Sequence, residues 1–159
     1  MGYLLLEKGL VWWEIPLIFF PRLFQHSMLQ SLSSTPSVEI VSSLGLVGGM
    51  KGYGFLLFSQ RNALLFTSTV SRALGYAIEG EELTELHRSF LLEFTNQIFG
   101  RTAGKFSRLG IDVRITPPSL LLGKGVSPLF FHEAAHLHLS IQGTFGTFLL
   151  SLILKHPLR

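Results

Sequence analysis

Alternating and glycine-punctuated apolar runs predict the strands of this chain. Two runs, 38–47 and 53–59, are separated by a glycine-rich segment, the pattern of a β-hairpin. A second pair, 136–141 and 147–154, is joined in the same way by 142–146. The sequence therefore predicts two hairpins with glycine-containing turns.

Apolar residues at helical spacing predict three helices, over residues 16–32, 62–74 and 81–109. The second and third end at Gly75 and Gly110, because glycine readily takes the backbone conformation that follows a helix. Acidic residues in the predicted first turn of the third helix suit the positive end of a helix dipole.

A short alternating run, 111–115, predicts a half-buried strand after the third helix. Two prolines interrupt it, and 120–122 continues the apolar pattern. Together the elements predict an α+β fold, an antiparallel sheet with long helices packed mainly on one face.

Composition limits the classes of function. The chain has 159 residues, of which 47% are hydrophobic and 14% charged, so we expect a single folded domain. We divide it into residues 1–37, an N-terminal extension and first helix, and a main domain over 38–159. The net charge is only +3 and no basic run is present, so no nucleic-acid partner is expected. The absence of cysteine excludes disulfides and thiolate chemistry and agrees with a reducing compartment.

The N-terminal apolar run, residues 10–20, is the one segment that invites a membrane interpretation. Its length is roughly half of the ~20 residues that a membrane span needs. It lacks the basic start and small-residue cleavage site of a signal peptide. We therefore expect no membrane span.

A polar stripe on the third predicted helix is the main candidate site. Ser89, Glu93, Asn96 and Gly100 stand at i, i+4, i+7 and i+11, within about 60° of arc on a helix. The opposite side is apolar, with Phe90, Phe94, Ile98, Phe99 and Phe106. Asparagine and glycine are poor helix formers, which favours a functional stripe. An ordinary solvated helix face, with Gly100 packed against a neighbouring element, remains the alternative.

The stripe resembles the pattern Asp/Ser-x3-Glu-x2-Asn-x21-Pro of the CheC/CheX/FliY chemotaxis phosphatases. Ser89, Glu93 and Asn96 have the required spacing, and Pro118 follows Asn96 after twenty-one residues. Segments 45–52 and 112–125 are also similar to CheX proteins, and the resemblance covers about residues 38–155. The main domain is thus identified as a CheX-like phosphatase domain.

The resemblance implies a phosphatase that removes the aspartyl phosphate of a CheY-like response regulator in chemotaxis signalling. Asn96 is expected to orient the attacking water, and Glu93 to pair with a receiver lysine. Ser89, Gly100 and Pro118 support the motif. The protein is expected to need no cofactor of its own, because the receiver brings Mg²⁺. A cytoplasmic location and a homodimer are also implied.

Two other functions stay open. His132-Glu133-Ala134-Ala135-His136 matches the H-E-x-x-H motif of zinc hydrolases, which binds metal only when it lies on a helix. The alternation over 136–141 instead favours a strand, and a third ligand would have to be His138 or His156. The second alternative is a CheX-like fold that serves as a non-catalytic binding or assembly module.

Overall fold

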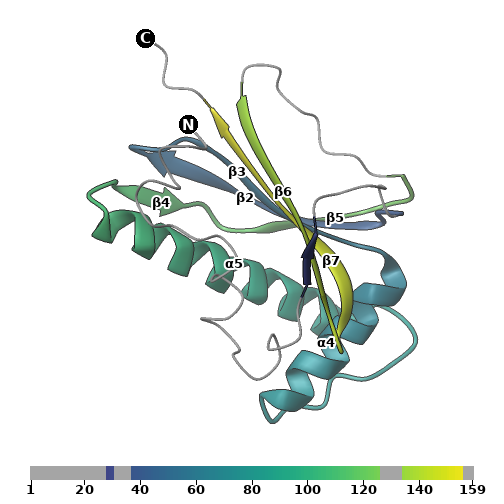
Figure 1. Ribbon diagram of the computed structural model, residues 1–159. Coiled ribbons are helices and arrows are strands. Elements are labelled where there is room, and N and C mark those ends of the chain that lie inside the picture. The colour runs from purple at the N-terminus through teal and green to yellow at the C-terminus, as the bar shows by residue number, and fades with distance from the viewer. Residues whose placement is uncertain (1–27, 31–36, 126–133, 156–159) are drawn as a thin grey trace.

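One antiparallel sheet and two helices form the described part of the chain, residues 28–30, 37–125 and 134–155 of this computed structural model (Figure 1). The strand order is β1-β6-β7-β3-β2-β4, and β5 pairs with the same edge of β2 as β4. The helices are α4 (Gln60–Ala73) and α5 (Glu85–Arg108). Both lie on the same face of the sheet (Figure 1), which confirms the predicted α+β architecture. The strands are β1 (Met28–Gln30), β2 (Ile40–Gly48), β3 (Gly52–Phe58), β4 (Val113–Ile115), β5 (Ser119–Leu122), β6 (Ala134–Gly143) and β7 (Gly146–Lys155).

The two predicted hairpins are confirmed as β2–β3 and β6–β7. They join side by side through β3 and β7, which places the hairpins at the centre of the sheet. The main core lies between this sheet and the helices, and phenylalanine rings fill much of it. The ring of Phe66 on α4 has its centroid 4.7 Å from that of Phe94 on α5 and 5.2 Å from that of Phe148 on β7. These contacts join both helices to the sheet.

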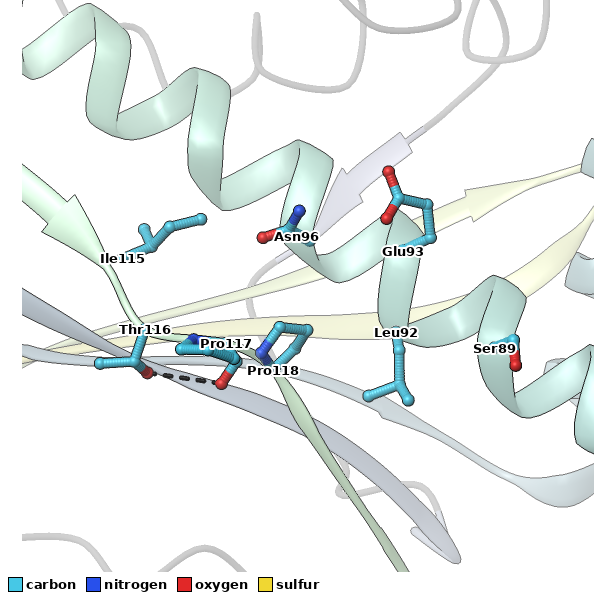
Figure 2. A pocket seen from close by; sticks show the side chains of 8 residues that line it. All are labelled: Ser89, Leu92, Glu93, Asn96, Ile115, Thr116, Pro117 and Pro118. Atoms are coloured by element: carbon cyan, nitrogen blue, oxygen red, sulfur yellow. Dashed lines mark hydrogen bonds between the residues drawn. The ribbon is translucent and has the colours of Figure 1, made fainter.

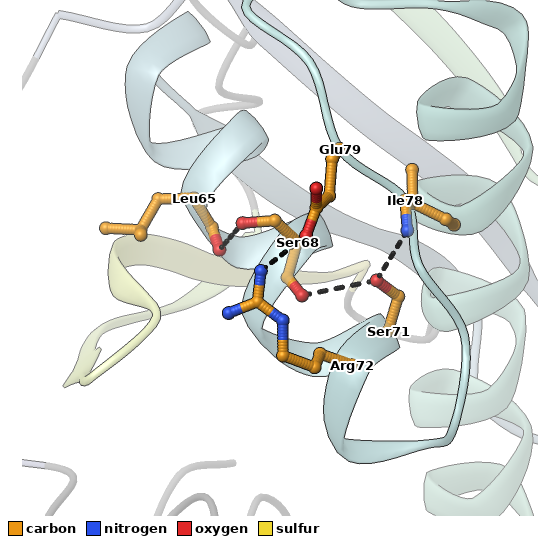
Figure 3. A network of polar contacts seen from close by, with 6 residues as sticks. All are labelled: Leu65, Ser68, Ser71, Arg72, Ile78 and Glu79. Atoms are coloured by element: carbon orange, nitrogen blue, oxygen red, sulfur yellow. Dashed lines mark hydrogen bonds and ion pairs between the residues drawn. The ribbon is translucent and has the colours of Figure 1, made fainter.

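The segment that leads from α4 towards α5 is held by polar contacts (Figure 3). The Ile78 backbone N–H donates to the Ser71 hydroxyl, and the Ser71 hydroxyl donates to the Ser68 carbonyl. Arg72 and Glu79 form an exposed ion pair at 2.6 Å. Exposed ion pairs contribute little, so the buried Ile78 side chain and its backbone bond are the firmer attachment.

Helix α5 begins four residues later than the sequence pattern predicts. Thr84 occupies the N-cap position, and Glu81 and Glu82 precede the helix. The His87 ring reaches back, so that the Thr84 backbone N–H donates to His87 Nδ1 at 3.3 Å. This bond satisfies a donor that a helix start otherwise leaves without a partner, and it explains why the helix begins here. At the other end Gly110 has φ +81°, the left-handed conformation expected of it.

The predicted first helix is wrong where the structure describes it. Residues 28–30 form strand β1, antiparallel to β6, with Leu29 opposite Ile141. Apolar spacing alone could not reveal this, because the backbone groups that pair with β1 belong to an edge more than a hundred residues away. The rest of the predicted helix and the apolar run at 10–20 lie outside the described residues.

No helix in the described part of the chain is long and apolar enough to cross a membrane. The longest, α5, carries charged and polar residues along one side throughout its length.

The buried imidazole of His87 makes stability depend on pH. Its side chain is 1% exposed, and desolvation lowers its pKa below the usual value. Below about pH 6.5 the unfolded chain therefore takes up a proton that the folded protein does not, and the free energy of unfolding falls. We expect denaturant midpoints to decrease between about pH 7 and pH 5.

The matched variant is His87→Gln, because glutamine at this position also bonds back to the N-cap backbone but does not titrate. We expect its midpoint to change less over the same pH range. An identical pH profile for the two proteins would contradict the role given to His87.

Candidate functional site

The packing of α5 on strand β2 decides which of its side chains are accessible. Phe94, Ile98, Phe99 and Phe106 are buried in the main core, as their spacing predicts. Between them, the hydroxyls of Thr95 and Ser42 hydrogen-bond to each other at 2.7 Å, with both side chains fully buried. A buried hydrogen bond between a helix and a strand favours one rotation of the helix, since another would separate the Ser42 hydroxyl from Thr95.

The opposite side of α5 carries the predicted stripe. Ser89 and Glu93 are exposed, and Asn96 is half-buried. Gln97 Nε2 donates a hydrogen bond to Glu93 Oε1 at 2.9 Å, which orients the carboxylate. The Asn96 carboxamide makes no hydrogen bond within the described part of the chain, so its donors and acceptor are available to a partner or a water.

A groove of about 530 Å³ runs beside these side chains (Figure 2). One wall is α5, from which Glu93 and Asn96 project on adjacent turns. The other wall is the segment between β4 and β5, where Pro117 and Pro118 face the helix. The lining residues are Ser89, Leu92, Glu93, Asn96, Ile115, Thr116, Pro117 and Pro118.

The groove therefore brings together four of the five predicted site residues, Ser89, Glu93, Asn96 and Pro118. Sequence reasoning missed Leu92, Thr116 and Gln97. A carboxylate and a glutamine four residues later form a helix-stabilising pair, so the contact between Glu93 and Gln97 could have been predicted from their spacing. Thr116 was not, because its partners lie on β2, 71 residues earlier.

Gly100, the fifth predicted residue, does not line the groove but continues the same side of α5. Among the described residues, a Cβ atom at this position would meet only Ile115 Cδ1, at an ordinary 3.6 Å. Packing against the described part of the chain therefore does not require glycine here. The alternative in which Gly100 makes room for a neighbouring element of its own chain is not supported.

The H-E-x-x-H motif does not form the helix that zinc binding needs. Its last three residues, Ala134 to His136, belong to β6. His132 and Glu133 lie outside the described residues. His138, considered as a third ligand, is half-buried in the same strand, and its Nδ1 lies 2.8 Å from the hydroxyl of Ser151. The zincin arrangement needs the motif on successive turns of one helix, and a chain that is already a strand from Ala134 onward does not provide it.

Comparison with known proteins places these features in a family. The family model described as chemotaxis phosphatase CheX matches residues 40–136, which include α5, the groove and both of its walls. The chain belongs to the CheX family. A CheX relative from Thermotoga maritima, named a CheY-P phosphatase, is 30% identical over 116 residues, which cover 65% of this chain and 72% of the relative.

Solved CheX structures share the fold at lower sequence identity. CheX from Vibrio vulnificus has a TM-score of 0.74 and 16% identity, covering 94% of this chain and 99% of that one. The CheX-CheY-BeF3-Mg²⁺ complex from Borrelia burgdorferi has a TM-score of 0.67 and 16% sequence identity, and the match covers 95% of this chain and 97% of that one. FliY from Thermotoga maritima has a TM-score of 0.64 and 18% sequence identity, and the match covers 93% of this chain and 87% of that one. The described part of the chain thus has the fold of these solved structures.

Gly100 offers a test of the CheX helix that is independent of activity. Since a methyl group fits at this position, Gly100→Ala should stabilise α5 by up to about 1 kcal/mol, the helix-propensity difference between the two residues. Gly104→Ala is the matched control, because a Cβ there meets nothing within 4 Å. Thermal unfolding should show both variants at or above the wild-type midpoint. A clear loss of stability in Gly100→Ala alone would restore the packing explanation for this glycine.

Proposed function

We propose that this protein hydrolyses the aspartyl phosphate of a CheY-like receiver domain in chemotaxis signalling, with Asn96 and Glu93 as the working residues. The observation that carries the proposal is their common position. A carboxamide that makes no hydrogen bond to the described residues and an oriented carboxylate project from adjacent turns of one helix beside one groove. The name of the Thermotoga relative, CheY-P phosphatase, supports the same activity.

Asn96 is suited to orient the attacking water. An acyl phosphate is already prone to hydrolysis, so catalysis requires a water held in line with the leaving oxygen. A carboxamide can accept a hydrogen bond from this water and donate one to it without ionising. A hundredfold acceleration corresponds to about 2.7 kcal/mol, within what accurate positioning of one reactant supplies.

Glu93 is suited to dock the helix on a lysine of the receiver. Its carboxylate is exposed, so it is accessible to a cation, and Gln97 limits the directions in which it can point. An ion pair that is dehydrated at an interface fixes the register of two partners. The register matters here because a water carried by Asn96 must meet the phosphorus atom in line.

The described residues do not suggest a resident metal. Among the described residues, no group of three His, Asp or Glu side chains is close enough to share an ion. Glu93 is the one carboxylate among the side chains that line the groove. We infer that Mg²⁺ comes with the receiver, where it would neutralise charge on the phosphoryl group. The Borrelia complex, which contains CheX, CheY, BeF3 and Mg²⁺, is consistent with this assignment.

Asn96 provides the sharpest test of catalysis. Receivers from the same genome are phosphorylated with acetyl phosphate, and phosphate loss is followed with and without the protein. We expect Asn96→Ala to lower the accelerated rate on the order of 100-fold while binding of the receiver is largely kept. Asn96→Asp, which preserves the shape but removes the amide donor, should also be inactive. Equal rates for wild type and Asn96→Ala would contradict the mechanism.

Glu93 should contribute to docking as well as to rate. Replacing it with alanine removes one partner of the proposed interfacial ion pair, so we expect a higher KM and a lower kcat/KM. Glu85→Ala is the control, since it removes an exposed carboxylate from the first turn of the same helix, two turns away from Glu93. If Glu85→Ala raised KM as much as Glu93→Ala, the effect would come from the loss of any negative charge on the helix. The specific ion pair of Glu93 would then be contradicted.

A non-catalytic binding module is the second candidate, and the same assay distinguishes it. Such a protein would bind the receiver without accelerating phosphate loss. The homodimer, the cytoplasmic location and the division at residues 37 and 38 stay predictions. Light scattering on the purified protein tests the homodimer directly.

A further inference from the structure

The second wall of the groove lies between two short strands that both pair with β2, and Thr116 attaches it to β2 in the gap between their ladders. Strands β4 and β5 pair with the same edge of β2, β4 with Leu46–Gly48 and β5 with Ile40–Ser43. Between these two ladders the chain crosses at residues 116–118, where the prolines have no N–H groups to donate. Thr116 makes the attachment there, and its backbone N–H donates to the Gly45 carbonyl at 2.9 Å.

The Thr116 side chain completes this attachment. Its hydroxyl oxygen accepts a hydrogen bond from the Gly45 backbone N–H at 2.8 Å. The hydroxyl also lies 3.5 Å from the Pro117 carbonyl oxygen, a long contact (Figure 2). The Thr116 side chain thus supplies the acceptor that a paired strand would otherwise give to the Gly45 N–H. It also contacts the backbone of Pro117.

Gly45 is matched to this contact. A Cβ atom at Gly45 would lie 3.2 Å from both Thr116 Cγ2 and Thr116 Oγ1, closer than ordinary packing allows. A larger residue would push the threonine, and with it the proline wall, away from β2. The absence of a side chain at Gly45 therefore allows the Thr116 hydroxyl to reach the Gly45 N–H.

The helical wall has its own attachment to the same strand. Thr95, next to Asn96, is hydrogen-bonded to Ser42 of β2. Ser42 and Gly45 are three residues apart, so β2 holds both walls of the groove at separate points. Loss of one attachment should leave the other wall in place.

We infer that Thr116 is a positioning residue for the partner: its hydroxyl sets the distance between the Pro117-Pro118 wall and the side chains of Glu93 and Asn96. This inference rests on the proposed phosphatase function. A displaced wall should weaken docking of the receiver. It should not change the step in which Asn96 orients water, because the Thr95–Ser42 bond holds the helix independently.

The test measures kcat and KM with a phosphorylated receiver for Thr116→Val and Thr116→Ser. Valine keeps the branched shape and the backbone bond but removes the hydroxyl, so we expect KM to rise about tenfold with kcat within about twofold. Serine retains the hydroxyl and should restore KM. Gly45→Ala, which approaches the same contact from β2, should raise KM in the same way.

Thr67→Val is the matched control. Thr67 is fully buried on α4 and its hydroxyl donates to the Ala63 carbonyl, so this variant also loses a hydroxyl hydrogen bond but does not touch the groove. Its KM should equal that of wild type, whatever its unfolding midpoint.

The possible outcomes separate the two levels of the argument. If wild type accelerates phosphate loss and Asn96→Ala does not, the phosphatase function stands, and Thr116 can be judged alone. An unchanged KM in Thr116→Val, a failure of serine to restore it, or an equal rise in Thr67→Val would overturn the positioning role. A parallel fall in kcat would show that the walls are not held separately. No acceleration by wild type would refute the function itself.

Discussion

The burial of one side of α5 against β2 is the constraint on which the site depends. Each residue of a helix is turned by about 100° from the last, so the positions of Phe94, Ile98 and Phe99 in the core determine where every other side chain points. Rotating the helix would expose phenylalanine and break the buried bond between Thr95 and Ser42. Glu93 and Asn96 point away from the core because the phenylalanine and isoleucine side chains beside them point into it.

The same constraint explains how much of the site the sequence could predict. The polar stripe and its apolar counterpart are properties of one continuous segment, so helical periodicity is enough to place Ser89, Glu93 and Asn96 together. The hairpins and α4 are local as well. Pro118 was found only through the spacing of a family pattern, since no local signal connects a proline after β4 with an asparagine on α5.

What the sequence could not predict depends on long-range pairing. Strand β1 exists because it pairs with β6, and Thr116 matters because Gly45 lies beside it, although the two are 71 residues apart. The start of α5 was missed for a local reason instead. Glu81 and Glu82 suit a helix dipole, but Thr84 and His87 form the cap, and a histidine is not the usual residue for that position.

The exposure of Glu93 also has an energetic consequence. A carboxylate in water pays no desolvation cost, so the free protein is not destabilised by keeping it in the groove. That cost arises only when a partner covers it, and a cation on the partner offsets it, whereas a neutral or acidic partner would not. In the proposed mechanism, the exposed carboxylate in the groove would therefore reject partners of the wrong charge before Asn96 reaches a phosphoryl group. On this proposal, selection of the partner and orientation of the water are two steps assigned to adjacent turns of the same helix.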